Sequence, residues 1–329
     1  MSAASNAVVV GGPDRGREAA GPGRRFSDRL WATALTGLGG MVLVVAGVIV
    51  LSLLQVAAPA LHKISVFSFL VNQTWDVSRD QFGALTFIYG TLVTSLVALL
   101  VAMPVAVGLA LFLTEMAPAG LRPIVSFPLE LLAGIPSVVY GLWGLFVMVP
   151  LLRERIEPAL AGTLGFLPFF QGPQIGLGYL AAGLVLAVMI LPTITSISIE
   201  VLRAVPGAQR EAALALGATR WEAIRLAVLP YARAGVIGAV MLGLGRALGE
   251  TMAVTMVIGN SPRISASLFA AGYSLPSVLA NEFAEASGEM HTGALAALGL
   301  ILFGVTLLLN AAAQLLVRLS TRGQGRVAT

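Results

Sequence analysis

The sequence predicts an all-α, polytopic membrane protein with about six transmembrane helices. Of its 329 residues, 57% are hydrophobic and only 11% are charged, whereas an ordinary soluble domain carries about 25% charged residues. The apolar residues gather into stretches long enough to cross the ~30 Å hydrocarbon layer as helices. These stretches are 31–58, 85–113, 125–149, 178–199, 235–259 and 292–317. Kinks are expected at Pro104, Pro136 and Pro192, which lie within these stretches or near their ends.

Both ends of the chain are predicted to lie in the cytoplasm. Residues 1–30 are rich in Gly, Pro, Ala and Arg and lack a helical apolar period, so we expect a disordered tail before a retained first helix. The membrane domain is then 31–317, and 318–329 forms a second tail. Fourteen of the 20 Lys and Arg residues fall in the two tails and in the connections 114–124 and 200–234. The positive-inside rule places these segments on the cytoplasmic side of the membrane.

Several chemistries are excluded by composition. The chain has no cysteine, which removes disulfides, thiolate metal sites and cysteine nucleophiles. Its two histidines, His62 and His291, lie near the edges of apolar runs, which argues against a metal site and against an intramembrane hydrolase. The single lysine, Lys63, is in no G-x-x-x-x-G-K-[ST] motif. If ATP drives this protein, a partner chain must hydrolyse it.

The connection 200–234 contains the sequence EAALALGATRWEAIRLAVLP at 211–230. Pro206 suits a first helical turn, and the alanine-rich residues that follow favour a helix. Gly217 supplies a left-handed cap that ends this helix. Thr219 and Glu222 form a T-x-x-E capping box, which begins a second helix. The sequence therefore predicts two short helices that meet at a glycine.

Two interpretations of this connection are open. An amphipathic element on the inner leaflet would show a broad apolar face opposite cationic residues. Here the charges alternate in sign, and small alanines line the first helix. We therefore favour a docking element that inserts into a groove of a partner protein.

The residues of this connection resemble the EAA loop of ABC importer permeases. The match is carried by Glu211, Ala212, Ala213, Gly217, Ile224, Leu229 and Pro230. Longer motifs at 80–96, 133–144, 242–260 and 279–286 resemble the permease subunits of phosphate importers. This resemblance covers nearly the whole chain apart from the N-terminal tail.

The resemblance implies a type I ABC importer permease fold in a bacterial plasma (inner) membrane. It further implies a subunit that catalyses no reaction and has no cofactor of its own. It also implies a second, related permease chain, two cytoplasmic ATPase subunits that hold ATP and Mg, and an external phosphate-binding protein. In that family the EAA loop is the coupling helix that contacts the ATPase. The residues expected to make this contact are Glu211, Ala212, Ala213, Gly217, Ala218, Thr219, Trp221, Glu222 and Ile224.

Two charged residues, Arg246 and Glu250, lie about midway along the fifth apolar stretch. One charge at that depth costs roughly 2.5–3.5 kcal/mol, so the two are expected to share a helix face and stabilise each other. They could form a structural ion pair, aided by a close helix contact at Gly245 and Gly249. Alternatively, they line a substrate pathway, the role that the resemblance also implies for Arg246 and Glu250.

The pathway interpretation has a specific chemistry. The planar guanidinium of Arg246 suits an oxyanion, and Glu250 can accept a hydrogen bond from hydrogen phosphate but not from sulfate, which has no proton to donate. We expect Glu130, near the cytoplasmic end of the third stretch, only to snorkel or to cap a helix there. Thr251 and Thr255 are expected to bond back to their own helix.

Other functions remain open on sequence grounds. The EAA loop does not distinguish phosphate from sulfate, molybdate or another small anion. A proton-coupled secondary carrier could also use Arg246 and Glu250, although the chain shows no convincing inverted halves.

Overall fold

The computed structural model describes residues 22–321, and the side chains of residues 31–318. Most of the predicted N-terminal tail (1–21) and the end of the C-terminal tail (322–329) therefore lie outside the described residues. The chain divides into two units, 1–52 and 53–329. Helix α1 (Pro22–Lys63) begins earlier than the expected start at Trp31.

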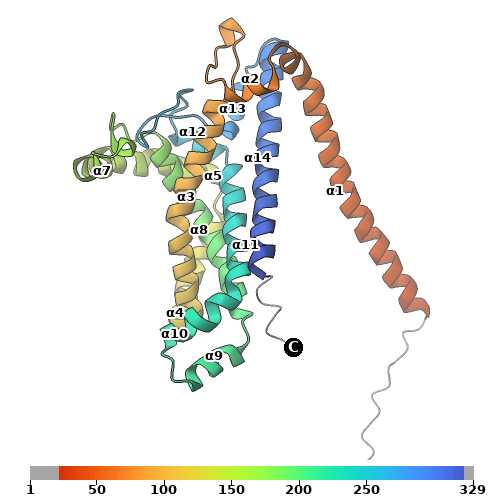
Figure 1. The fold of residues 1–329 in the computed structure, drawn as a ribbon, viewed down its shortest axis with the longest axis vertical. Helices are drawn as coiled ribbons and strands as arrows, with labels where there is room; N and C mark the ends of the chain where they lie inside the picture. The colour runs from red at the N-terminus through yellow and green to blue at the C-terminus, as the bar shows by residue number, and fades with distance from the viewer. Residues whose placement is uncertain (1–21, 322–329) are drawn as a thin grey trace, which may run out of the picture. The chain divides into compact units, whose positions relative to one another are not determined.

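The rest of the described chain is helical and contains no β-strand, as Figure 1 shows. The further α-helices are α2 (Val66–Val71), α3 (Leu85–Leu111), α4 (Leu121–Gly134), α5 (Ser137–Trp143), α6 (Val149–Leu151), α7 (Glu157–Leu164), α8 (Tyr179–Arg203), α9 (Gly207–Ala215), α10 (Arg220–Ala223), α11 (Leu229–Leu248), α12 (Met252–Val257), α13 (Leu275–Glu282) and α14 (Glu289–Thr321). Short 3₁₀ turns are η1 (Val77–Arg79) and η5 (Pro168–Phe170), and π-helical turns are η2 (Phe112–Met116), η3 (Gly144–Met148), η4 (Leu152–Ile156) and η6 (Ile224–Val228). The all-α prediction is confirmed.

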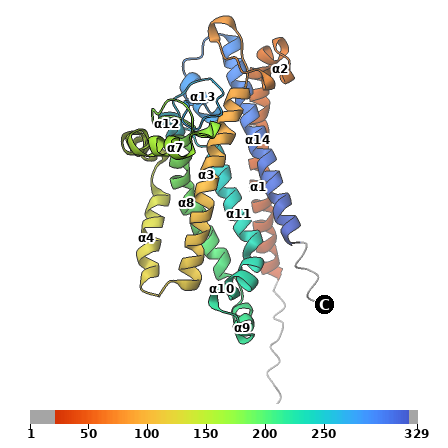
Figure 2. The same cartoon turned by 60° about the vertical axis from the view of Figure 1, so that its left-hand side comes forward.

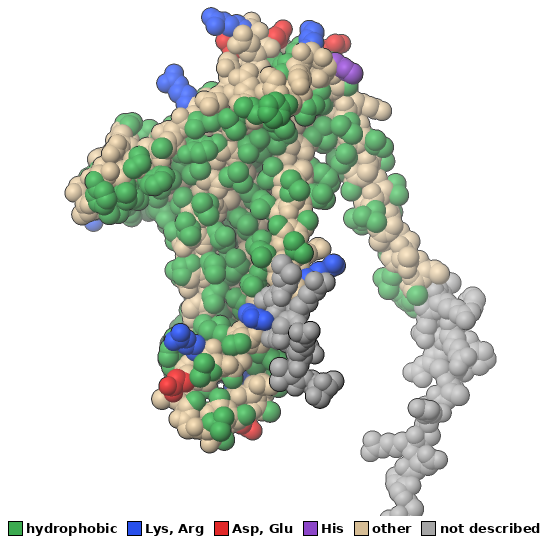
Figure 3. Space-filling view, in the orientation of Figure 1, with side chains coloured by type: hydrophobic (Ala, Val, Ile, Leu, Met, Phe, Trp, Pro, Cys, Tyr) green, Lys and Arg blue, Asp and Glu red, His purple; other side chains and the backbone are tan. Residues whose placement is uncertain are grey.

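Six helical stretches of the described chain are long and apolar enough to cross a membrane. They are Trp31–Lys63, Leu85–Met116, Ser137–Leu164, Tyr179–Arg203, Arg220–Leu248 and Glu289–Arg318. The expected number of spans is thus confirmed. Their exposed faces are apolar, with Leu100 and Phe146 well exposed, and Figure 3 shows hydrophobic side chains along the bundle between charged groups at its two ends. Large exposed apolar surfaces of this kind mark contact with lipid or with other chains.

The third span differs from the expectation. Residues 125–149 were expected to form one helix and 150–177 a loop, but α4 ends at Gly134 and the helical structure after Ser137 continues to Leu164. Proline disfavours the helical conformation of the residue before it and lacks an N–H donor. Ile135, which precedes Pro136, is accordingly extended (φ −70°, ψ 130°). Pro104 and Pro192, by contrast, lie inside the continuous helices α3 and α8.

Helix α8 lies at the centre of the second unit. It packs against α3 on one side and α11 on the other, and most of its apolar side chains are buried. Small residues bring these helices close together: Gly183 of α8 faces Val97 of α3, and Gly243 of α11 faces Ile194 of α8, each without room for a Cβ. Small residues at helix contacts are the usual means of tight packing between membrane helices.

The two ends of the bundle carry different elements. Helices α9 and α10 lie at one end, together with the connection between α3 and α4, as Figure 2 shows. We call this the α9 end. Helices α2 and α13 lie at the other end, which we call the α13 end.

Candidate functional site

The first candidate site is the elbow, which we define as residues 206–230 at the α9 end. Helix α9 begins after Pro206 and ends at Ala215. Gly217 follows in the left-handed conformation (φ +85°). Its N–H donates to the Leu214 carbonyl at 3.0 Å, and that of Ala218 donates to the Ala213 carbonyl at 3.2 Å. This pair of bonds is a Schellman motif, so the predicted glycine break is confirmed.

The predicted capping box is also present. The Glu222 N–H donates to Thr219 Oγ1 at 3.3 Å, and the Thr219 N–H donates to Glu222 Oε2 at 2.8 Å. The second helix, however, is not short. From α10 it continues through the π-helical turn η6 into α11, and Pro230, which lacks an N–H donor, directly follows that turn. The second arm of the elbow is therefore continuous with the fifth span.

The elbow exposes apolar side chains at its tip. Leu216 is 90% exposed, Leu226 69% and Trp221 57%. A hollow of about 530 Å³ opens between the two arms, lined in part by Ala212 and Ala213. Of the nine residues expected to contact a partner, Glu211, Ala212, Gly217, Thr219, Trp221 and Glu222 are exposed, and Ala213 and Ala218 are half-buried. Ile224 is instead 3% exposed, which places it inside the protein.

An ion pair that the sequence analysis did not single out holds the elbow to the bundle. Arg210 of α9 meets Glu115 of η2, the turn that extends α3, in a forked arrangement, with Nε 3.0 Å from Oε2 and Nη2 2.6 Å from Oε1. Arg210 also donates to the carbonyls of Val205 (2.7 Å) and Leu202 (3.0 Å). The hydrogen bond with Glu115 raises the pKa of Arg210 above its ordinary value, against the opposing effect of burial. One side chain therefore ties α9 to the ends of α3 and α8.

The second candidate site is the break between α11 and α12. Helix α11 ends at Leu248 and α12 begins at Met252. Glu250 lies in the break, where its Oε1 accepts from the Ala253 N–H at 3.3 Å. Arg246 Nη1 donates to Thr193 Oγ1 of α8 at 3.2 Å. Among the described residues Arg246 and Glu250 form no ion pair.

The expectation that this pair shares a face of one continuous helix is therefore wrong. The break after Gly249 removes the i, i+4 geometry, and the carboxylate of Glu250 lies at the start of α12 instead. The helix contact expected at Gly245 is also absent from the described residues, since nothing lies near that position, and Gly243 makes the contact with α8. Thr255 bonds back to the Thr251 carbonyl at 2.7 Å, as predicted.

Arg246 keeps most of its binding capacity. A guanidinium has five N–H donors, and the exposed side chain of Arg246 uses one of them on Thr193. Glu250 is half-buried nearby in the chain. The arrangement can hold an oxyanion through the unused guanidinium donors, with a carboxylate close in sequence that accepts protons.

The chain is similar to known transport proteins over most of its length. The sequence model of the family described as "Binding-protein-dependent transport system inner membrane component" matches residues 84–322. A protein of Mesorhizobium japonicum named "Phosphate transport system permease protein PstC" is 46% identical over 306 residues, covering 91% of this chain and 93% of the relative. The protein of the same name from Haemophilus influenzae is 43% identical over 92% of this chain and 98% of the relative. A Mycobacterium tuberculosis protein named "PstC 2" is 43% identical over 89% of this chain and 92% of the relative.

Solved structures share the fold at low identity. A chain of the MetNI methionine ABC transporter in inward facing conformations has a TM-score of 0.54 and 20% identity, covering 71% of this chain and 94% of its own. A chain of a bacterial alginate ABC transporter, in complex with its periplasmic protein bound to an alginate pentasaccharide, has a TM-score of 0.57 and 16% identity, covering 88% of this chain and 94% of its own. The fold is therefore that of ABC importer permeases.

Proposed function

This chain belongs to the family of binding-protein-dependent transport system inner membrane components, and from that premise we propose that it is the membrane-spanning permease subunit of an ATP-driven phosphate importer. The single observation that carries the choice of phosphate is the similarity to relatives named as phosphate permeases, which extends over 91% of the chain. Arg246 supports an oxyanion substrate, because its unused donors suit one. In this proposal Arg246 and Glu250 line the substrate pathway.

The elbow supports ATP coupling by a partner. Its tip offers exposed Leu216 and Trp221 beside a hollow between two helical arms, the kind of projection that fits a groove. Arg210 ties its first arm to α3 and α8, and its second arm is continuous with α11. A push on the tip would therefore reach three spans at once. The buried Ile224 would act by holding the arms in place.

The assembly that follows has four kinds of chain. A PstA-like permease completes the pathway, two PstB-like ATPases bind the elbows and hold ATP and Mg, and a PstS-like protein delivers phosphate from outside. The α9 end and both termini then face the cytoplasm, which agrees with the arginine distribution. ATP-driven closure of the ATPases moves the elbows and alternates the pathway between its outward and inward openings.

The test is uptake by the assembled complex in proteoliposomes. We expect ATP-dependent accumulation of labelled phosphate. Excess unlabelled phosphate should inhibit it, whereas excess sulfate or molybdate should not. A complex whose ATPase chain binds ATP without hydrolysing it serves as the control and should show none.

Two results would count against the proposal. Stronger competition by sulfate or molybdate than by phosphate would identify another oxyanion as the substrate. Accumulation that persists without the ATPase chain, and follows a proton gradient, would identify a secondary carrier.

A further inference from the structure

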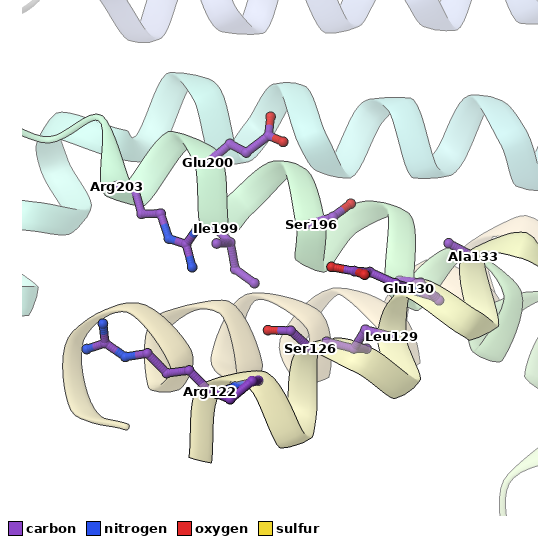
Figure 4. A pocket seen from close by; sticks show the side chains of 11 residues that line it. Arg122, Ser126, Leu129, Glu130, Ala133, Ser196, Ile199, Glu200 and Arg203 are labelled. Atoms are coloured by element: carbon purple, nitrogen blue, oxygen red, sulfur yellow. The ribbon is translucent and has the colours of Figure 1, made fainter. Parts of the chain in front are cut away.

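A second polar cavity lies between α4 and α8, away from Arg246 in the sequence. Its volume is about 560 Å³, within the range of small-molecule sites. The lining residues are Arg122, Pro123, Ser126, Leu129, Glu130, Ala133, Pro192, Ser196, Ile199, Glu200 and Arg203. Figure 4 shows that Arg203 of α8 and Glu130 and Ser126 of α4 point into the space between the two helices.

These three side chains have unused polar groups. Arg203 and Glu130 form no ion pair among the described residues. The other arginine, Arg122, is engaged elsewhere, since it donates to the carbonyls of Ala117 and Thr114 (3.2 and 3.4 Å). Glu200 is a second carboxylate of the lining, but its side chain points away from α4 (Figure 4), so Arg203, Ser126 and Glu130 are the groups that face the space between the two helices.

The cavity lining and the residue that binds Arg246 are neighbours along α8. Thr193, which accepts the hydrogen bond from Arg246, directly follows Pro192 of the cavity lining. Ser196 lies one helical turn further and donates to the Thr193 carbonyl at 3.2 Å, and Arg203 ends the helix at the α9 end. Polar groups therefore follow α8 from Arg246 to the end of the bundle.

We propose that this cavity is a second binding station for inorganic phosphate, occupied between Arg246 and the α9 end. Arg203 attracts the anion, Ser126 donates to one of its oxygens, and Glu130 accepts the proton that hydrogen phosphate carries. Like the α11–α12 break, the station has an arginine that forms no ion pair with the carboxylates near it among the described residues. Glu130 is then part of the pathway and not only a snorkelling residue. The inference rests on the proposed function, because it assigns a further site on the same route.

A lipid headgroup carries the same phosphate chemistry, so the test must separate the two sources. The chain contains no cysteine, which makes a single introduced thiol unique within it. We would place cysteine at position 126 or 196 (Ser126→Cys, Ser196→Cys) in the full transporter complex in nanodiscs and follow its reaction with N-ethylmaleimide. Ile124→Cys is the matched control, because Ile124 is 67% exposed on α4 and does not line the cavity.

We expect inorganic phosphate to slow the labelling of both cavity thiols, and equal sulfate to leave it unchanged. Labelling of the Ile124→Cys control should not respond to phosphate. Adding Arg203→Gln should raise the half-protecting phosphate concentration about tenfold, as expected for one lost charge-assisted hydrogen bond. Adding Glu130→Gln should let sulfate protect as phosphate does.

Two outcomes would overturn the inference. In the first, phosphate does not change the labelling rate of either thiol, although the complex still accumulates phosphate with ATP. This result would leave the proposed function intact. In the second, labelling is slower in nanodiscs that contain phosphatidylglycerol than in nanodiscs of phosphatidylcholine alone, and inorganic phosphate slows it no further. This result would make the cavity a lipid site. Failure of the unmodified complex to accumulate phosphate would instead contradict the proposed function itself.

Discussion

Arg210 in the elbow and Arg246 at the α11–α12 break are surrounded very differently. Arg210 makes a forked ion pair with Glu115 and two further bonds to backbone carbonyls. Arg246 makes one hydrogen bond, to the Thr193 hydroxyl, and its side chain is exposed. The first guanidinium is almost saturated by its own chain, and the second is almost free.

This difference separates two uses of the same side chain. A saturated guanidinium holds elements together, because each bond it makes would be lost if the elements moved apart. A guanidinium with unused donors in a membrane protein has its desolvation compensated by something outside its own chain, such as water, a partner chain or a substrate. Arg210 is therefore a positioning residue, and Arg246 is available to bind an anion.

The largest effect is expected at Arg246. Replacing it in Arg246→Ala should lower phosphate uptake by the reconstituted complex roughly 10- to 100-fold, the loss of a charge-assisted bond worth about 1.5–3 kcal/mol. The thermal midpoint of the purified complex should stay unchanged, because the side chain makes only one bond to its own chain. Arg246→Lys should recover part of the rate, since a lysine keeps the charge but loses the planar fork.

The matched control is Arg153→Ala, which removes an exposed arginine (60% exposed) outside both candidate sites. It should leave uptake unchanged. Normal uptake by Arg246→Ala, or a large fall in its thermal midpoint, would contradict the contrast between the two arginines.

A smaller effect, mainly on stability, is expected at Arg210. Arg210→Ala or Glu115→Ala should destabilise the protein by about 1–3 kcal/mol, below the 3–5 kcal/mol typical of a fully buried pair, because Arg210 is 27% exposed. Each single variant should also hydrolyse more ATP for each phosphate transported, since α9 is no longer tied to α3 and α8. Both quantities are measurable on the same reconstituted complex.

The double variant provides the decisive comparison at this pair. If the two residues act together, Arg210→Ala combined with Glu115→Ala should cost less than the sum of the single changes. Arg210→Lys should not restore coupling, because an ammonium cannot make the forked contact. Additive effects, or an unchanged ratio of ATP to phosphate, would show that the pair does not transmit motion.

Local signals predicted the elbow well and the Arg246 site less well. The glycine break at Gly217 and the box of Thr219 and Glu222 depend on neighbouring residues, so their spacing in the sequence was sufficient. The helix break after Leu248 lies within the apolar stretch 235–259, and the apolar periodicity of that stretch continues without a signal that the helix ends there. The spacing of four residues therefore predicted a shared helix face for Arg246 and Glu250 that the structure does not have.

Long-range contacts were the other limit. Glu115 and Arg210 are 95 residues apart, and each alone is an ordinary charged residue near a helix end. The predicted topology did place both at the same end of the bundle, which was the one signal that could have paired them. The cavity between α4 and α8 could not be predicted, because residues 125–149 were expected to form one helix, whereas α4 ends at Gly134 and the third span begins at Ser137.

The smallest effect is expected at the tip of the elbow. Thr219→Ala removes the cap of the second arm and should destabilise that helix start by about 1 kcal/mol, which speeds hydrogen exchange at the amide of Glu222. Thr219→Ser should behave like the original protein, because serine caps equally well. Thr163→Ala is the matched control, since that exposed threonine only bonds back to the Ala159 carbonyl of its own helix.

The same variant should have a small effect on uptake. Because Arg210 and not the cap ties the elbow to the bundle, Thr219→Ala should lower uptake less than Arg210→Ala does. The reverse order would mean that the tip, and not the ion pair, limits the transmission of motion.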